Sequence, residues 1–186
     1  MKAHGMLFSA PMIRALLNTK PDVWPAKPIN ESLPYKWQTR RLHHTPGPHP
    51  VGTLIYAKET FQPRQLASVV TEWNYRATDK QSLAPWKPSI FMPKAAARLW
   101  FQVVAVRVER VNDIYPGDCL AEGIAIPEAV QRASALNFGG GEFDTIDWDP
   151  TEDYERLWDS INGKGSFARG PFVWVYELRR LGANTL

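Results

Sequence analysis

A short stretch near the start of the chain combines residue types that could carry out acid–base chemistry. Residues 35–41 read Tyr-Lys-Trp-Gln-Thr-Arg-Arg, and the Thr39 hydroxyl follows Lys36 at a spacing of three residues. A threonine becomes a nucleophile only when a base removes its proton. Lysine can be that base only when burial or nearby cations lower its pKa from about 10.4 towards neutrality. The stretch predicts either a catalytic pair or an ordinary basic segment at a strand edge.

Two arginines follow this pair directly. Because a guanidinium can hold an anion with two parallel hydrogen bonds, Arg40 and Arg41 are candidates for binding a phosphate or a base. Successive residues of a strand point to opposite faces, so we expect at most one of the two to face a pocket. The alternative is a pair of surface residues without a function.

Four further residues are candidates for the same pocket. Trp37 and Trp86 lie in predicted loops, where an aromatic ring could stack on a nucleic-acid base. Glu59, at the end of a predicted strand, and Lys87 are secondary candidates. All four would act in substrate binding rather than in the reaction itself.

Histidine and cysteine give little support to a metal site. Three of the histidines, His43, His44 and His49, lie in a segment that prolines interrupt, and no carboxylate lies close to them in sequence. This pattern favours a solvated loop over a metal site. Cys119 is the only cysteine, which excludes a disulfide framework and a four-cysteine zinc site. We therefore expect no metal and no cofactor.

The elements that must position these residues follow from hydrophobic periodicity. Ser9 can cap a helix that ends near Thr19, because Pro21 disfavours helix at the residue before it. Alternating β-branched residues predict a long strand over residues 99–111, with these side chains inward: Val104, Val106 and Val108. Further strands are predicted over residues 5–9, 54–60, 69–75 and 172–178. A turn or short helix is predicted at residues 116–117, and helices are predicted over residues 126–136 and 149–161. Thr151 is the predicted N-cap of the second helix.

This element order indicates an α+β fold. Strands are separated by short helices, and the longest strand exceeds the usual length enough to bend around a small β-barrel. The chain of 186 residues, 44% of them hydrophobic, is most simply one domain, 1–186. Prolines over residues 20–35 predict an insertion on the surface near the pocket mouth.

Charge and hydropathy limit the possible binding partners and the cellular compartment of the protein. The formal net charge of +3 permits a nucleic-acid partner without requiring one. The N-terminus lacks the apolar run of a signal peptide, and no segment approaches the roughly 18 apolar residues of a membrane span. We expect a cytoplasmic protein with no membrane association and no obvious protein partner.

Seven stretches match one protein family in their order along the chain. They are residues 6–9, 38–41, 52–60, 86–93, 121–124, 157–163 and 171–175. Through them the chain resembles ASCH-domain proteins of the type common in bacteriophage genomes, which would place it in a bacterial host cell. The resemblance implies a PUA-like β-barrel, a fold associated with RNA and modified nucleosides.

The resemblance also implies an activity. Some small relatives are amidohydrolases that remove the acetyl group of 4-acetylcytidine, and others have been described as metal-dependent ribonucleases. The early motif of the family is Gly-x-Lys-x-x-Thr-x-Arg, and Lys36, Thr39 and Arg41 fill its last three named places, while Pro34 stands where glycine is expected. Glu122 matches the glutamate that completes the amidohydrolase set.

The sequence offers two candidates for the lysine of this motif. In typical relatives the motif follows the first helix directly, whereas residues 20–35 intervene here, so Lys20 is an alternative motif lysine. We favour Lys36 because only Lys36 keeps the spacing to Thr39. The sequence therefore predicts hydrolysis of an acyl amide on a modified cytidine by Lys36, Thr39 and Glu122. The alternatives are a non-catalytic RNA-binding module and a metal-dependent ribonuclease.

Overall fold

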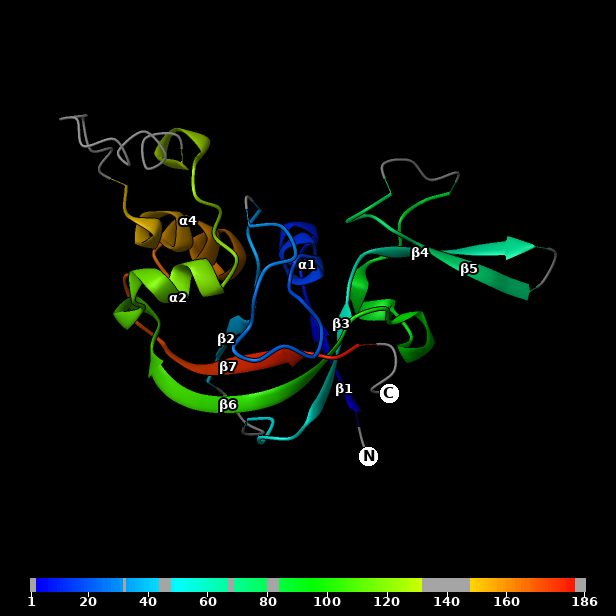
Figure 1. Cartoon of the computed structure of the whole chain (residues 1–186), viewed down its shortest axis with the longest axis horizontal. Helices are drawn as coiled ribbons and strands as arrows, with labels where there is room; N and C mark the ends of the chain where they lie inside the picture. The colour runs from blue at the N-terminus through cyan, green and yellow to red at the C-terminus, as the bar shows by residue number, and fades with distance from the viewer. Residues whose placement is uncertain are drawn as a thin grey trace.

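Five strands form one curved, mixed sheet in the computed structural model, which describes residues 3–31, 33–43, 48–66, 69–79, 84–131 and 148–182 (Figure 1). The strands are β1 (Ala3–Leu7), β2 (Gln38–Leu42), β3 (Leu54–Lys58), β6 (Trp100–Arg110) and β7 (Phe172–Arg180). Their order is β1-β3-β6-β7-β2; β1 and β3 are parallel, and the other pairs are antiparallel. The strand order leaves β1 and β2 as the two edges.

The predicted α+β class is confirmed, whereas the described strands do not close into a barrel. No ladder joins β1 to β2 within the described ranges. A side chain crosses between these edges instead, since Arg41 on β2 donates a hydrogen bond to the carbonyl oxygen of Leu7 on β1. The long strands predicted at residues 99–111 and 172–178 are both present as β6 and β7.

Three α-helices pack around this sheet: α1 (Ala10–Leu17), α2 (Pro116–Ala121) and α4 (Pro150–Asn162). In Figure 1, α2 and α4 lie together at one end of the β6–β7 pair, and α1 lies nearer the other end. Short 3-10 turns complete the set: η1 (Ser89–Phe91), η2 (Lys94–Ala96) and η3 (Val111–Asp113). None of the helices in the described ranges is long and apolar enough to span a membrane.

Two predicted helix details change. The N-cap of α4 is Asp149, whose carboxylate accepts a hydrogen bond from the Thr151 amide at 2.9 Å. Thr151 was therefore placed wrongly as the cap, because the prolyl residue at position 150 already occupies the first helical position. Residues 128–131 are helical, and the remainder of the helix predicted over 126–136 lies outside the described residues.

Two apolar cores lie against the main sheet. The first joins α1 to the strands, with Ile13 and Leu16 against Phe101, Val103 and Leu178. The second lies between β7 and the helices α2 and α4 and includes these buried residues: Val111, Ile114, Cys119, Tyr154, Trp158, Val173 and Val175. The cavity described below lies where the elements of both cores meet.

A two-stranded hairpin, β4 (Phe61–Leu66) with β5 (Val69–Tyr75), extends away from this body (Figure 1). The sequence predicted β5 but not β4, because Pro63 and its polar neighbours give β4 no alternation of β-branched residues. The base of the hairpin packs on a small third core of Phe61, Met92 and Ala96. The hairpin and the turns η1 and η2 are therefore one packed unit.

The inward face predicted for β6 is wrong in part. Phe101 and Val103 are buried and Val106 packs against the first core, whereas Val108 is 44% exposed and Val104 is only partly covered. A β-bulge shifts the register between Val103 and Ala105, so that the alternation seen in the sequence does not continue through the strand.

The segment over residues 20–35 is mostly exposed, as predicted, but it does not line the cavity. The end of α1 holds it in place. The Asn18 side chain donates hydrogen bonds to the carbonyl oxygens of Asn30, Leu33 and Pro34 at 2.9, 2.9 and 3.2 Å. The segment lies beside the site without forming its mouth.

Which face of β6 is buried can be tested by replacing a valine with alanine at two positions of the strand. Val103→Ala should lower the free energy of unfolding by about 2 kcal/mol, because Val103 is fully buried and alanine leaves a cavity. Val108→Ala in the same strand should cost less than about 0.5 kcal/mol. Urea unfolding followed by circular dichroism measures both, and equal losses would restore the predicted face.

Candidate functional site

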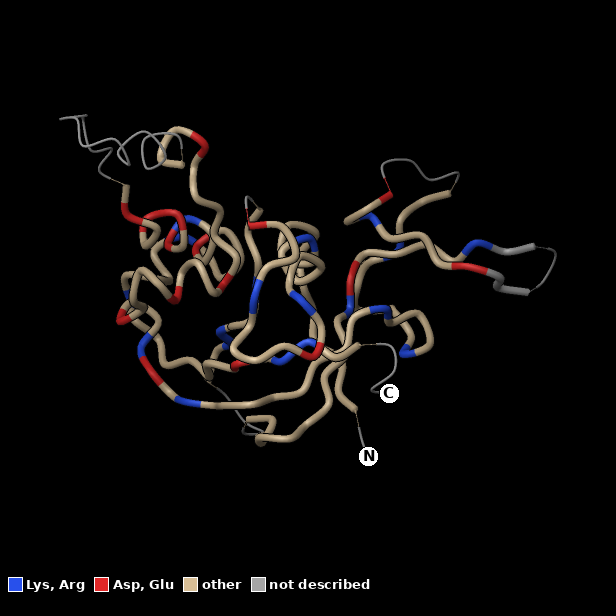
Figure 2. Tube along the Cα trace, in the orientation of Figure 1, with Lys and Arg blue, Asp and Glu red and all other residues tan. Residues whose placement is uncertain are grey.

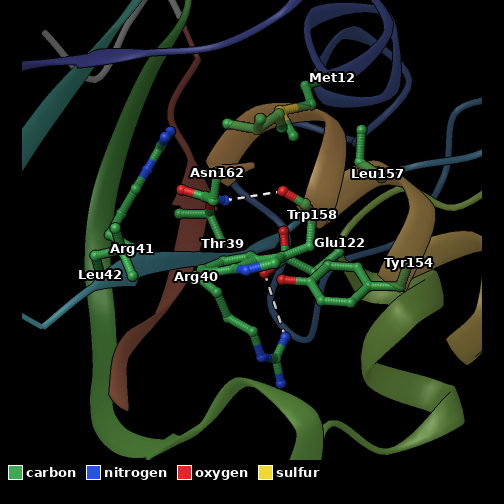
Figure 3. A pocket seen from close by; sticks show the side chains of 11 residues that line it. Met12, Thr39, Arg40, Arg41, Leu42, Glu122, Tyr154, Leu157, Trp158 and Asn162 are labelled. Atoms are coloured by element: carbon green, nitrogen blue, oxygen red, sulfur yellow. Dashed lines mark hydrogen bonds and ion pairs between the residues drawn. The ribbon is translucent and has the colours of Figure 1, made fainter. Parts of the chain in front are cut away.

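A cavity of about 240 Å³ lies between α1, β2, the end of α2 and α4 (Figure 3). Its polar lining consists of Thr39, Arg40, Arg41, Glu122 and Asn162, and the other lining residues are Met12, Leu42, Tyr154, Leu157, Trp158 and Ile161. Strand β2 supplies four consecutive lining residues. Both arginines line the cavity, so the prediction that at most one of them faces a pocket is wrong.

Lys36 lies beneath this cavity and is fully buried. Its amide donates a hydrogen bond to the Ala15 carbonyl oxygen at 3.2 Å, and its own carbonyl accepts one from the Thr19 hydroxyl at 2.8 Å. The end of α1 thus fixes the backbone from which the side chain extends. The Lys36 ammonium donates to the carbonyl oxygen of Glu122 at 2.8 Å and forms an ion pair with the carboxylate of the same residue.

The turn after α2 must approach Lys36 closely to make this contact. Gly123 has a φ of +92°, and a Cβ there would lie 3.1 Å from the Cβ of Ala15 and 3.4 Å from that of Lys36. A glycine meets both requirements, since it adopts positive φ without strain and has no side chain. Gly123 therefore allows Glu122 to lie over Lys36 with its carboxylate at the cavity.

Arg40 holds the other oxygen of the Glu122 carboxylate. The guanidinium is 3.2 Å from Glu122 Oε1 and also donates to Glu109 at 2.7 Å and to Asp118 at 2.8 Å. A further hydrogen bond of 3.0 Å runs to the Gln38 side chain. With these partners Arg40 has few donors left for a ligand, so we assign it to positioning Glu122 rather than to binding an anion.

Arg41 is in a different situation. Its guanidinium lies 5.1 Å from the centre of the Phe8 ring and donates to the Leu7 carbonyl oxygen. Its Nε is buried and has no hydrogen-bond partner within the described ranges. Burial lowers the pKa of Arg41, although the Glu122 carboxylate opposes this shift. Of the two arginines, Arg41 is the one with donors available to a ligand.

Burial also acts on the titratable groups next to the cavity. Desolvation lowers the pKa of Lys36 below 10.5, while the charge and the hydrogen bond of Glu122 act in the opposite direction, and Arg41 and Arg40 lower it further. The pKa of Tyr154 is raised well above 10.0, chiefly by burial, so its hydroxyl is protonated at neutral pH. The shift of Lys36 has the sign that a lysine base requires.

Thr39 is buried at the wall of the cavity. It lies on β2, after Lys36 and directly before the two arginines in sequence. Asn162 faces it from the last turn of α4 (Figure 3). The Asn162 amide nitrogen donates to the Trp158 carbonyl oxygen at 3.1 Å, which turns the side-chain oxygen away from the helix and into the cavity. The cavity thus presents a hydroxyl, a carboxylate, an amide oxygen and a guanidinium.

Sequence reasoning did not find Asn162 or Tyr154. Both are on α4, far from residues 35–41 in sequence, and nothing in their spacing indicates a site. The one available signal for Asn162 was its place in the stretch 157–163, one of the seven that carry the family resemblance.

The other predicted binding residues lie away from the cavity. The ring of Trp37 packs against Trp24, with ring centres 5.5 Å apart. Glu59 is buried in a bidentate ion pair with Arg98, at 2.8 and 2.9 Å, next to the hairpin. The remaining two candidates, Trp86 and Lys87, also lie beside the hairpin, where Lys87 pairs with Phe61 through its backbone.

The alternative motif lysine and the histidines also lie elsewhere. Lys20 is exposed at the surface, so the geometry favours Lys36. His43 stacks on Trp174 with ring centres 4.3 Å apart, and His49 lies 4.6 Å from His4. His44 is outside the described residues. No group of three metal-ligating side chains occurs in the described part of the chain.

Comparison of the chain with protein-family models, with curated proteins and with solved structures found no match. The geometry of the site and the resemblance of its motif therefore carry the functional argument.

The balance of charges around Lys36 predicts opposite pKa shifts in two variants. Glu122→Gln removes the charge that raises the Lys36 pKa, so the pKa should fall further below 10.5. Arg41→Met removes a cation that lowers it, so the pKa should rise. Nuclear magnetic resonance titration of the Lys36 side chain measures both directly. Shifts of the same sign in the two variants would contradict the arrangement described here.

Proposed function

We propose that the cavity binds a nucleoside or an RNA base that carries an N-acyl group, and that the protein hydrolyses this amide. The observation that carries the proposal is the contact between the buried Lys36 side-chain nitrogen and Glu122, directly behind the cavity wall that holds Thr39. These are the three residues that the resemblance to ASCH amidohydrolases implies. The same resemblance supports a PUA-like barrel, in which the hydrogen bond from Arg41 to Leu7 would bridge the open edges β1 and β2.

Each group has a role that follows from its surroundings. Lys36, in its neutral form, takes the Thr39 proton by way of the Glu122 carboxylate, which touches both the lysine and the cavity. The freed oxygen attacks the carbonyl carbon of the acyl group, and Arg41 stabilises the negative charge that develops on the carbonyl oxygen. The carbon–nitrogen bond then breaks, and the departing amine takes this proton from the Lys36 ammonium by way of the Glu122 carboxylate. A water molecule then attacks the acyl-threonine, which releases the carboxylic acid and returns a proton to the Thr39 oxygen.

The shape and chemistry of the cavity favour a small, planar ligand. Its volume of about 240 Å³ suits a base with a short acyl group rather than a larger ligand. The rings of Tyr154 and Trp158 and the side chain of Met12 supply apolar surface. The Asn162 oxygen accepts a hydrogen bond and the Arg41 guanidinium donates one, which is the combination that a base edge with one N–H and one acceptor requires.

The catalytic role is tested by variants that keep the size of each side chain. Lys36→Met, Thr39→Val and Glu122→Gln should each lower kcat for release of acetate from 4-acetylcytidine by about 10²–10⁴, the usual contribution of acid–base catalysis. Thr39→Ser keeps a hydroxyl and should retain activity, and Lys20→Met serves as the control for loss of a lysine. Circular dichroism checks that each variant folds.

The main alternative is a base-binding module without catalysis. In that case the purified protein would bind acylated cytidine without releasing acetate, and Arg41→Met would weaken binding more than Thr39→Val. Full activity in Thr39→Val or Lys36→Met would exclude the proposed mechanism.

A further inference from the structure

Acidic residues predominate on the helices α2 and α4, and basic residues outnumber acidic ones around the hairpin (Figure 2). The described residues within 113–162, a region that includes α2 and α4, comprise nine acidic and one basic side chain. The described residues within 54–100, a region that includes β3, the hairpin and the turns η1 and η2, comprise six basic and three acidic ones. The cavity lies between α4 and α1, so a polyanion that reaches it is repelled on one side and attracted on the other.

A chain of contacts leads from the cavity to the basic end. Arg41, at the cavity, donates a hydrogen bond to the Leu7 carbonyl oxygen. Leu7 is paired in the sheet with Lys58, and the Lys58 ammonium donates to the carbonyl oxygen of Ile90 in η1. The segment that holds η1 and η2 carries the exposed residues Lys87 and Lys94. We define Arg41, Lys58, Lys87 and Lys94 as the basic track.

An exposed aromatic ring lies on this track. Phe91 is 71% exposed, although its neighbour Met92 is almost fully buried and anchors the turn. The sulfur atom of Met92 accepts a hydrogen bond from the Glu59 amide at 3.1 Å, and the Lys58 ammonium donates a hydrogen bond to the carbonyl oxygen of Ile90. The turn is therefore fixed to the core while it presents Phe91 to solvent. An aromatic ring flanked by lysines is the combination that binds an unpaired base and its phosphates.

The lysines of the track keep charges that are available to an anion, although the Lys58 ammonium also donates to the Ile90 carbonyl oxygen. Within the described ranges, none of the three forms an ion pair with a carboxylate, whereas the nearby Arg64 and Arg98 are paired with Glu72 and Glu59. Lys94 lies 5.3 Å from the centre of the Trp100 ring, which keeps its ammonium at the surface of this segment. In this region the two arginines are therefore neutralised by carboxylates, and within the described ranges the three lysines are not.

We propose that the basic track binds the backbone of a single-stranded nucleic acid, with one base stacked on Phe91, and leads the strand to the cavity. The last step of this proposal, in which a base of the strand enters the cavity, rests on the proposed function. The track itself makes an independent claim, because phosphate and stacking contacts on residues 58–94 do not depend on hydrolysis.

The test uses a labelled oligouridylate of about 12 nucleotides, within the range of single-strand binding sites, and fluorescence anisotropy on the full chain over a series of salt concentrations. The double variant Lys87→Glu, Lys94→Glu should reduce the slope of log affinity against log salt by at least about 1.4, because each phosphate contact contributes about 0.7. The matched control is Lys164→Glu, an exposed lysine at the acidic end, which should leave the slope unchanged.

The stacking contact has its own matched pair. Phe91→Ala should weaken binding about 5- to 100-fold, whereas Tyr115→Ala, which removes a ring that is 74% exposed beside α2, should not. An equal effect of Lys164→Glu, or no binding by the wild type, would overturn the proposal. So would displacement of the strand by polyglutamate at equal charge, which would indicate an acidic protein partner instead.

Hydrolysis of free 4-acetylcytidine separates this proposal from the proposed function. The double lysine variant should retain it, since no residue of that variant touches the cavity. If the wild type binds the strand through the track but releases no acetate, only the proposed function fails. If it releases acetate and the track variants bind like wild type, only the track fails.

Discussion

The buried ion pair between Lys36 and Glu122 is the interaction around which the site is organised. An ammonium with no access to water costs several kcal/mol unless a partner and hydrogen bonds compensate, and removing one member of such a pair typically costs about 3–5 kcal/mol. The fold must therefore bring three separate segments to one point: the end of α1, the start of β2 and the turn after α2. Gly123 and the Thr19 hydroxyl are consequences of that requirement, because one permits the close approach and the other fixes the backbone.

The two arginines beside this pair illustrate how neighbours decide the role of a side chain. Arg40 has three carboxylates around it and shares Glu122 with Lys36, so that the carboxylate is held from both sides. Arg41, the next residue, has a carbonyl oxygen and an aromatic ring as neighbours and keeps a buried Nε without a partner in the described part of the chain. The first orients the carboxylate, and the second is available to a ligand.

The open edges of the sheet also connect the cavity to the rest of the surface. A closed ladder between β1 and β2 would fill the region where Arg41 reaches Leu7, whereas the present arrangement leaves the guanidinium between the cavity and the outer face of β1 and β3. The acidic helices α2 and α4 lie towards one end of the view in Figure 2, and the hairpin lies towards the other.

The sequence by itself determined most of the regular elements, since periodicity and turn residues indicated α1, β5, β6, β7 and α4 near their observed bounds. It also indicated Lys36, Thr39 and Arg41 as one group, because they lie within six residues of each other. The family resemblance named Glu122 with them, but only the tertiary structure showed its contact with Lys36 and added Asn162, since these residues lie 86 and more positions apart and no local pattern encodes such pairings. The β-bulge in β6 and the division of roles between Arg40 and Arg41 were likewise decided by packing and by charged neighbours, which strand alternation alone does not specify.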